Sequence, residues 1–457
     1  MKVKDLTYGA ILKNLLIVAL PLTITNVINM AYNLTDMFWV GQLDYQAVTA
    51  IGTAGLFLWL AYGFFQFASS GTQIKVSHAV GEKNYDDVRY YAITGLKIAA
   101  IVGLVYAGFA FFFREFAINI FELPTLETAN RAKSYLAIVS FAVIFQAINT
   151  TYVAIFNGVG NSKMVLIISS TGLLVNMILD PLLIHGLDLG VAGAAWATLI
   201  ASTVPTMIFT YYAFTKIKIF DEFNLLRIKT KHASTILKLS IPTAVQSLFF
   251  TGIAMYISRE TLIFGEDAMA VQRIGSQIES LTWMIGIGAN VAISVFVGQN
   301  FAAGKWRRLI KGYTLMMGIM TIYGALVSIF LYSSGYFLFD IFLNEEFVIE
   351  LGEKYLKVLA LSQLGMMFET ICSGTFYGLG KTYIPSAISI IGNALRVPLL
   401  LILTPSMGVY GIWWAITLSS IFKGLAGLIM FAIHAIKNNN IKFKYFVERY
   451  DSSLEVS

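Results

Sequence analysis

One stretch of the chain decides the fold: Pro21-Leu-Thr-Ile-Thr-Asn-Val-Ile-Asn-Met-Ala-Tyr-Asn-Leu-Thr-Asp36-Met-Phe-Trp-Val-Gly41. Hydrophobic residues flank it on both sides, and Asp36 lies well inside the apolar segment. A carboxylate in the hydrocarbon core of a membrane costs about 2.5–3.5 kcal/mol on insertion scales, so we expect Asp36 to face a partner or a water-filled cavity. The alternative is an acid that reaches water from the helix end, because Gly41 follows only about one turn later.

A second acid in the same kind of setting favours the interior placement. It lies in Asn176-Met-Ile-Leu-Asp180-Pro181, inside another apolar segment. Asn176 and Asp180 are four residues apart, so they share one face of a helix. Pro181 has no N–H, which leaves the carbonyl of Met177 without its usual helical donor.

The composition is that of an integral membrane protein. Of the 457 residues, 57% are hydrophobic and 13% are charged, whereas a soluble domain carries about a quarter charged residues. The single cysteine, Cys372, excludes an internal disulfide framework. The net charge of +6 indicates basic loops on one side of a membrane rather than binding of nucleic acid. We interpret the first apolar segment as a retained helix, because no small-residue cleavage site follows it.

Twelve apolar segments are each long enough to cross about 30 Å of hydrocarbon. They span residues 13–40, 47–75, 88–113, 134–157, 163–186, 191–214, 234–264, 268–300, 308–334, 353–378, 382–404 and 409–436. The second segment is the least well defined, because Gly52, Gly55, Gly63 and Gly71 loosen a helix. The sequence predicts an all-α membrane protein with an N-lobe (1–214), a linker (215–232), a C-lobe (233–436) and a tail (437–457).

The two six-helix halves resemble each other in sequence. Gly158-Val-Gly160 returns as Gly378-Leu-Gly380, and similar pairs recur in the same order along both halves. Each half has an even number of segments, so the two copies have the same orientation and are related by an axis along the membrane normal, which suits alternating access. Lys and Arg gather in the loops of one side, which predicts that both termini lie in the cytoplasm.

Four residues form the predicted cation site: Asp36, Asn176, Asp180 and Thr198. Their ligand atoms are all oxygens, a set that suits a hard cation such as Na⁺ rather than Cu or Zn. The two carboxylates could instead share a proton, because neighbouring carboxylates do not both ionise cheaply. The sequence leaves both ions open. Pro21 is either a static kink or a hinge coupled to the charge of Asp36.

The second half of the sequence lacks an acid at the place that corresponds to Asp180 in the first half. It has Asn393-Ala-Leu-Arg396-Val-Pro398 where the first half has the segment around Asp180, so the ion site is expected in the N-lobe only. Glu279 and Glu369 are expected deep in the C-lobe, facing a central cavity. Met255 either contributes to an adaptable apolar wall or packs as ordinary core. The predicted substrate and coupling region comprises Pro21, Asn29, Tyr32, Gln246, Met255, Glu279 and Glu369.

These motifs resemble the multidrug and toxic compound extrusion (MATE) transporters over residues 10–436, and within them the DinF-like and archaeal branch. The block from Tyr32 to Gly41 and the Gly-x-Gly-Asn-Ser-Lys163 block carry the resemblance. It implies a V-shaped pair of lobes and antiport of organic, often cationic and amphipathic, compounds against Na⁺ or H⁺ in the cell membrane. It places the coupling ion at Asp36, Asn176, Asp180 and Thr198, with Tyr32 beside it and Pro21 at the bending point. The C-lobe acid of the other bacterial branch is missing, because Gln246-Ser-Leu-Phe-Phe-Thr251 occupies that region.

Two other functions would require different residues. A lipid-linked saccharide flippase of the same superfamily would line its cavity with several cationic residues, whereas the deep polar residues here are mainly acids and amides. A membrane-embedded enzyme would need a catalytic constellation or a metal cluster, and the four histidines are scattered at loops and helix ends. We therefore predict a monomeric transporter of small molecules, without enzymatic activity and without a cofactor other than the coupling ion.

Overall fold

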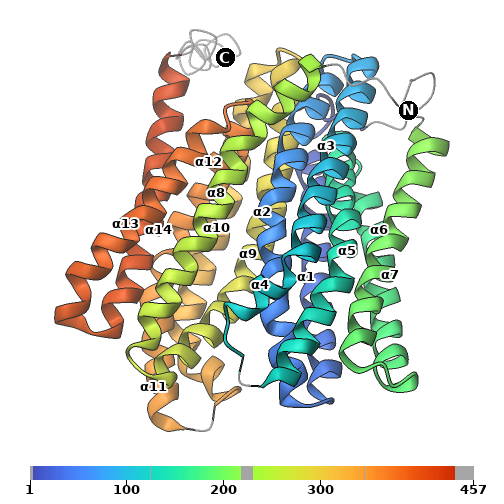
Figure 1. The fold of residues 1–457 in the computed structure, drawn as a ribbon. Helices are drawn as coiled ribbons and strands as arrows, with labels where there is room; N and C mark the ends of the chain where they lie inside the picture. The colour runs from blue at the N-terminus through green and yellow to red at the C-terminus, as the bar shows by residue number, and fades with distance from the viewer. Residues whose placement is uncertain (1–3, 124, 218–229, 344, 438–457) are drawn as a thin grey trace. The chain divides into compact units, whose positions relative to one another are not determined.

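The computed structural model describes residues 4–123, 125–217, 230–343 and 345–437. Within its helices, the side chains of residues 32–34, 37, 45, 216–217, 230–231 and 437 also lie outside the description. All regular structure in the described ranges is helical (Figure 1). The helices are α1 (Ile11–Gly41), α2 (Tyr45–Gly81), α3 (Tyr85–Phe112), α4 (Arg114–Asn119), α5 (Leu126–Gly158), α6 (Ser162–Pro181), η1 (Leu182–Gly186), α7 (Gly190–Tyr212), η2 (Ala213–Ile217), α8 (Thr230–Leu262), α9 (Glu266–Ala302), α10 (Trp306–Asp340), α11 (Glu346–Ala360), α12 (Gln363–Gly378), α13 (Tyr383–Met407) and α14 (Val409–Lys437).

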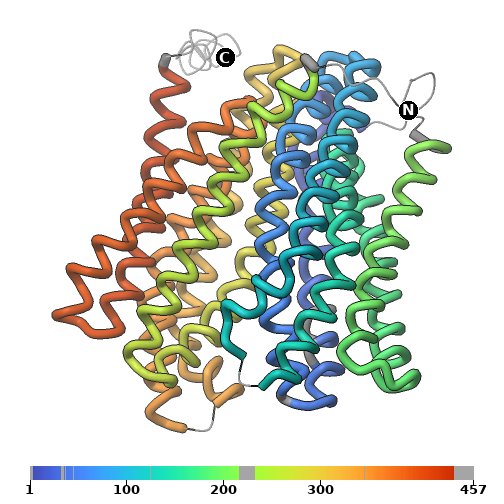
Figure 2. Tube along the Cα trace, in the orientation of Figure 1, coloured from blue at the N-terminus to red at the C-terminus, as the bar shows by residue number. Residues whose placement is uncertain are grey.

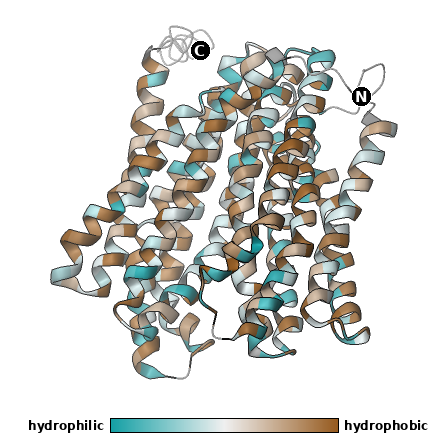
Figure 3. Cartoon of the chain, in the orientation of Figure 1, coloured by the Kyte–Doolittle hydropathy of each residue, from teal (hydrophilic) through white to brown (hydrophobic). Residues whose placement is uncertain are grey.

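Hydrophobic side chains cover the outside of these helices. Figure 3 shows hydrophobic residues along their whole length, with many of the hydrophilic residues near helix ends. On α10, Ile322, Leu326 and Ile329 are 65%, 62% and 66% exposed. This spacing puts all three on one helix face, and an apolar stripe of this kind suits contact with lipid. Eleven helices in the described part are long and apolar enough to cross a membrane. The prediction of an all-α membrane protein is therefore confirmed.

The segment predicted as one span over residues 353–378 is two helices. α11 ends at Ala360 and α12 begins at Gln363, so neither helix is long enough to cross a membrane by itself. At the break, the Ser362 hydroxyl donates to the carbonyl of Leu359 over 2.7 Å, and the Ser362 N–H bonds the same carbonyl. Local serine bonds of this kind compete with the regular helical pattern. The break is a feature that hydropathy alone did not predict.

The glycines of α2 do not interrupt the helix, which runs without a break from Tyr45 to Gly81. Gly71 instead permits close packing against α8. Its N–H donates to the Ser240 hydroxyl over 2.8 Å. A Cβ atom at position 71 would lie 2.3 Å from the carbonyl oxygen of Ile236, so a larger residue does not fit here. The glycine therefore serves helix packing rather than flexibility.

The internal repeat of the sequence is visible in two matching helix ends. After α5, Gly160 has φ 75° and the Asn161 N–H bonds the carbonyl of Phe156 over 2.8 Å. After α12, Gly380 has φ 72° and the Lys381 N–H bonds the carbonyl of Phe376 over 2.9 Å. Both ends are the glycine-based motif in which a left-handed residue closes a helix. The repeated glycines predicted from sequence thus stop corresponding helices in the same way.

The chain divides into two compact units. Unit 1 consists of Met1–Asp5 and Leu16–Leu248, and unit 2 of Leu6–Leu15 and Phe249–Ser457. In unit 1, α2, α3, α5 and α7 pack together around a buried core that includes Phe65 and Leu136 (Figure 2). In unit 2, a second core that includes Tyr355 and Trp413 joins α9, α10, α11 and α14. Of the predicted linker, residues 218–229 lie outside the described ranges.

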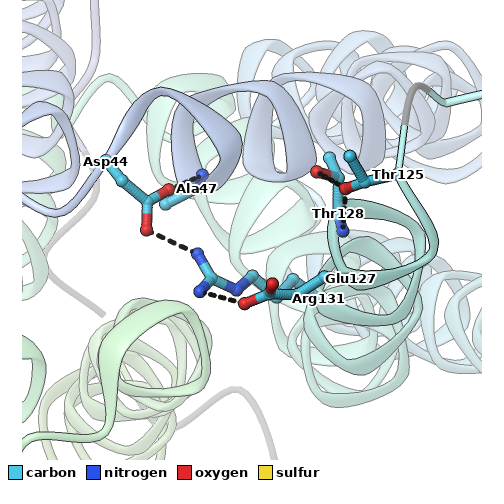
Figure 4. A network of polar contacts seen from close by, with 6 residues as sticks. All are labelled: Asp44, Ala47, Thr125, Glu127, Thr128 and Arg131. Carbon is cyan, nitrogen blue, oxygen red and sulfur yellow. Dashed lines mark hydrogen bonds and ion pairs between the residues drawn. The ribbon is translucent and has the colours of Figure 1, made fainter.

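The N-terminus of α2 is held by a polar network (Figure 4). Asp44 caps the helix by accepting the Ala47 N–H over 2.6 Å, and its second oxygen accepts from Arg131 of α5 over 2.7 Å. Arg131 also donates to Glu127 over 2.6 Å. The Arg131 guanidinium and then the Ala47 N–H hold the pKa of Asp44 below its usual range. This network fixes the start of α2 against α5.

Candidate cation site

The first acid lies on a helix that continues through a proline. α1 contains Pro21 in its interior, and the Thr25 hydroxyl donates to the Pro21 carbonyl over 2.8 Å. Proline removes one backbone donor from a helix, so the turn before Pro21 is held by fewer bonds than its neighbours. Asp36 follows near the end of the same helix, and its side chain is half-buried.

The second acid is fully enclosed. Asp180 is 0% exposed, and its Oδ1 accepts a hydrogen bond from Asn176 Nδ2 over 2.5 Å, one turn earlier on α6. Pro181 comes directly after Asp180, and the chain then widens into the π-helical turn η1. Wide turns of this kind occur often at functional sites. The predicted pairing of Asn176 with Asp180 on one helix face is thus seen in the structure.

The two acids come together inside unit 1. The carboxyls of Asp36 and Asp180 are close enough to interact electrostatically. Asn176 Nδ2 occupies Oδ1 of Asp180, and the buried Oδ2 has no hydrogen-bond partner among the described residues. Two ionised carboxylates in contact repel each other strongly when water is excluded. The geometry therefore calls for a proton or a cation between them.

Thr198 reaches the acid pair through a tyrosine. On α7, the Thr198 hydroxyl donates to the carbonyl of Ala194 over 3.0 Å, which leaves its lone pairs for other groups. The side chain of Tyr135, from α5, lies close enough to Thr198, Asp36 and Asp180 to interact with all three. Tyr135 is 5% exposed. The sequence interpretation missed this residue, although a buried tyrosine hydroxyl needs a polar partner and so signals one nearby.

The ligand atoms around the acids are oxygens of carboxylate, amide and hydroxyl groups. Such a set fits a hard monovalent cation such as Na⁺, and the carboxylate pair equally fits a proton. Across the described residues, no group of three or more His, Cys, Asp or Glu side chains gathers in a way that would hold a metal ion. The residues present are therefore compatible with both coupling ions that the sequence left open.

Comparison with known proteins identifies the family. A family model described as MatE matches residues 21–182 and 242–402, which is most of the chain. The chain belongs to the MatE family. It is 27% identical over 92% of both chains to the probable multidrug resistance protein NorM of Thermotoga maritima. It is 25% identical to the multidrug export protein MepA of Staphylococcus haemolyticus, over 96% of this chain and 97% of that protein.

A solved structure has the same fold as this MatE protein. It is described as MATE in the bent conformation and superimposes with a TM-score of 0.89, at 19% identity over 96% of this chain and 98% of that chain. This agreement concerns the fold of the chain. The placement of this MatE protein in the DinF-like branch stays a prediction.

The remaining residues predicted for the substrate region are spread over the two units. Asn29 is exposed on α1, and the side chain of Tyr32 lies outside the described part of the molecule. Gln246 is half-buried on the section of α8 that belongs to unit 1. Met255 is 46% exposed on the section of α8 that belongs to unit 2. The role of these residues in substrate binding stays a prediction.

Glu279 and Glu369 lie in unit 2 with polar partners that the sequence interpretation did not assign. Glu279 accepts a hydrogen bond from Gln363 over 3.0 Å. Glu369 forms an ion pair with Lys423 over 2.9 Å. Glu279 and Glu369 are therefore each bonded to a side chain of the same unit. Whether they contribute to a substrate cavity stays a prediction.

Proposed function

We propose that this MatE protein is a secondary active efflux transporter. It exports organic, often cationic and amphipathic, compounds and takes up Na⁺ or H⁺ in exchange by alternating access. The fold and family of the chain support this proposal, as do relatives that are named for multidrug resistance and multidrug export. The Na⁺ or H⁺ is bound by Asp36, Asn176, Asp180 and Thr198, with Tyr135 beside them.

One observation carries the proposal. The Oδ2 atom of Asp180 is buried and has no hydrogen-bond partner among the described residues, and the Asp180 carboxyl interacts with that of Asp36. Two unit charges about 4 Å apart repel by about 4 kcal/mol at an effective dielectric constant near 20. A cation or proton between the carboxyls removes this repulsion, so the ion-bound and ion-free sites differ substantially in energy. Such a difference is what a coupling site requires.

The coupling works through differential affinity. An ion drives a conformational change only if it binds one state of the protein more tightly than the other. Loss of the ion from the acid pair leaves two repelling carboxylates, one on α1 and one on α6. The turn before Pro21 has one fewer backbone bond, so α1 is the helix that bends most easily in response. Substrate binding favours the arrangement that has released the ion.

The protein is placed in the cell membrane with both termini in the cytoplasm. The basis is the distribution of basic residues, which favour cytoplasmic loops. Lys75, Lys83, Lys305 and Lys381 lie at or near helix ends that belong to the proposed cytoplasmic side. With this orientation, the ion enters the cell from outside and the substrate leaves the cell. These two opposite movements belong to one antiport cycle.

The proposal is tested with purified protein in liposomes that contain ethidium as the substrate. Inward Na⁺ and H⁺ gradients are imposed separately, and dye movement is followed by fluorescence. We expect at least one gradient to drive transport, and dissipation of that gradient to stop it. Transport that continues after all ion gradients are collapsed and that depends on ATP would overturn the proposal.

A further inference from the structure

The first helix of the chain is divided between the two compact units. Residues 6–15, which include the first turn of α1, belong to unit 2, and α1 from Leu16 onward belongs to unit 1. Near the other end of α1, Val40 is 3% exposed in the core of unit 1. Pro21 lies between these two ends and removes one backbone donor from the helix. A single helix therefore connects the units, and its most easily bent turn lies between its two ends.

The residues just before α1 are bonded to the turn between α9 and α10. We call Leu6, Thr7 and Tyr8 the N-terminal strap, and residues 299–308 the α9–α10 turn; both lie in unit 2. Leu6 is 0% exposed, and its N–H donates to Oε1 of Gln299 over 2.8 Å. Gln299 is also 0% exposed, so bulk water does not compete for this bond. Leu6 therefore anchors the strap in unit 2.

Two cations of the α9–α10 turn bind oxygen atoms of the strap. Arg308 donates from Nη2 to the carbonyls of Leu6 and Tyr8 over 3.1 and 2.9 Å, and from Nε to the Leu6 carbonyl over 3.2 Å. Lys305 donates from Nζ to the carbonyl and the hydroxyl of Thr7 over 3.0 and 3.1 Å. Hydrogen bonds from charged donors are stronger than those between neutral groups. Three consecutive residues of the strap are therefore held by charged side chains.

The strap is also bonded to the first turn of α1. Asn14, which is 7% exposed, donates from Nδ2 to the carbonyls of Leu6 and Tyr8 over 3.1 and 2.6 Å. These are the same two carbonyls that accept from Arg308. The strap therefore joins the first turn of α1 to the α9–α10 turn through a continuous set of hydrogen bonds.

The first helix of the second half is divided in the opposite sense. Residues 230–248 of α8 belong to unit 1, and the remainder of α8 belongs to unit 2. Within unit 1, the Ser240 hydroxyl accepts the Gly71 N–H over 2.8 Å. α8 also carries its own proline, Pro242. Because the first helix of each half begins in one unit and continues in the other, the division is a feature of the repeated fold rather than of one helix.

We propose that Arg308 and Lys305 make α1 the link through which a change of charge at Asp36 reaches unit 2. This inference rests on the proposed efflux function, because it concerns how ion binding is passed to the rest of the protein. Rigid helices and hydrogen-bond networks carry energetic coupling between distant sites when they have two arrangements. When α1 bends near Pro21, its first turn does not move freely, since the strap is bonded to the α9–α10 turn. Arg308 and Lys305 are thus positioning residues for transport, and neither belongs to the cation site.

A different interpretation gives the strap a role in folding only. In that case its bonds stabilise unit 2, and the α9–α10 turn does not respond to the charge at Asp36. The proposed link requires such a response, because a charge shifts a conformational equilibrium only if the two states differ in their interaction with it. Exchange of backbone amide hydrogens reports local opening of a structure. It therefore separates the two interpretations.

The test compares the wild-type protein with Asp36→Asn. Both full-length proteins are placed in nanodiscs in sodium-free buffer at alkaline pH, so that the wild-type acid pair is without its ion. Asp36→Asn removes one negative charge from the pair, as binding of an ion would. Hydrogen exchange is followed by mass spectrometry, and we expect the rates within residues 6–15 and 299–308 to differ between the two proteins by about threefold or more. Equal rates in both segments would overturn the proposal.

Variants then assign the response to one side chain. In Arg308→Gln, the α9–α10 turn should no longer respond to Asp36→Asn, whereas the residues around position 36 should still respond. Arg308→Lys should restore part of the response, because the charge returns without the planar fork. The matched control is Lys311→Gln, which removes an exposed cation of the same helix, α10, and should keep the full response. A full response of the turn in a folded Arg308→Gln protein would contradict the proposal.

The two proposals fail in different ways. If the α9–α10 turn responds to Asp36→Asn but ethidium is not moved by any ion gradient, the efflux function is wrong and the link through α1 stands. If ethidium transport is ion-driven but the turn does not respond to Asp36→Asn, only the link through α1 is wrong.

Discussion

Asn176 donates its side-chain amide to Oδ1 of Asp180 over 2.5 Å, from one turn earlier on α6. The bond occupies Oδ1 of Asp180 and leaves the buried Oδ2 for a second partner. It also orients the buried carboxylate, because Asp180 has no exposed surface through which water could compete. The relationship between these two residues therefore sets the geometry of the proposed cation site.

Replacing Asn176 is expected to weaken ion binding while leaving the acids in place. In Asn176→Leu, the carboxylate loses a charge-assisted hydrogen bond worth about 1.5–3 kcal/mol, so the ion concentration for half-maximal transport should rise about tenfold or more. The measurement is dye transport in liposomes as a function of Na⁺ or H⁺ concentration. An unchanged half-maximal concentration would show that Asn176 does not orient Asp180 for the ion.

Tyr135→Phe tests the residue that the sequence interpretation missed. The ring keeps its packing, but the variant lacks the hydroxyl that interacts with Thr198, Asp36 and Asp180. We expect the ion dependence of transport to shift several-fold, since one neutral hydrogen bond contributes about 1 kcal/mol. The control is Tyr152→Phe, which removes another tyrosine hydroxyl of α5, one that hydrogen-bonds Thr210 of α7 over 2.9 Å. Equal effects of the two variants would argue against a role of Tyr135 in the site.

Gly71→Ala is expected to destabilise unit 1. The added Cβ would lie 2.3 Å from the carbonyl oxygen of Ile236, so α2 and α8 must separate. Overpacking of this kind typically costs about 1–3 kcal/mol. Gly55→Ala, on the same helix, is the control: among the described residues, no atom of another segment lies within 4 Å of its Cβ position, and alanine is the better helix former. Thermal unfolding in detergent should show a lower Tm for Gly71→Ala only.

Asp44 provides a pH-dependent prediction. Its pKa is lowered in the folded protein, so its contribution to stability is present above the unfolded-state pKa near 3.9 and is lost as the pH falls through the folded-state value. Asp44→Asn keeps a good N-cap but loses the bond to Arg131, at a cost of about 0–1 kcal/mol for an exposed pair. The small Tm difference from wild type at pH 7 should vanish as Asp44 protonates.

Asp44→Ala separates the cap from the ion pair. It loses both, and removal of an N-cap side chain costs about 1 kcal/mol. Its Tm at pH 7 should therefore lie below that of Asp44→Asn. A difference between wild type and Asp44→Asn that persists unchanged at acidic pH would mean that the bond to Arg131 does not stabilise the fold.

Much of this picture could be predicted from the sequence. Asp36 and Asp180 stand out because charged groups in apolar segments are rare, and Asn176 follows from its helical spacing to Asp180. The repeated glycines pointed to the matching helix ends at Gly160 and Gly380. These features depend on residue type and local spacing, which are properties that a sequence displays directly.

Other features depend on contacts between distant segments. Tyr135 looks like any tyrosine of an apolar helix until α5 packs beside α7 and brings it to Thr198. Ser362 gives no sign that its hydroxyl will bond Leu359 and separate α11 from α12. The partner of Glu369 lies on α14, far along the chain, so the ion pair with Lys423 could not be assigned from spacing. The packing of distant helices determines these contacts, and the hydropathy of the sequence does not predict that packing.

The most direct test of the central claim is ion-driven dye transport by Asp36→Asn and Asp180→Asn in liposomes. Each variant replaces a carboxylate by an amide of nearly the same shape, so the helices should fold while the shared ion loses one of its two charged ligands. The proposed mechanism predicts that each variant alone abolishes transport driven by either gradient, with folding confirmed by an unaltered elution volume. Transport at wild-type rates by both variants would contradict it.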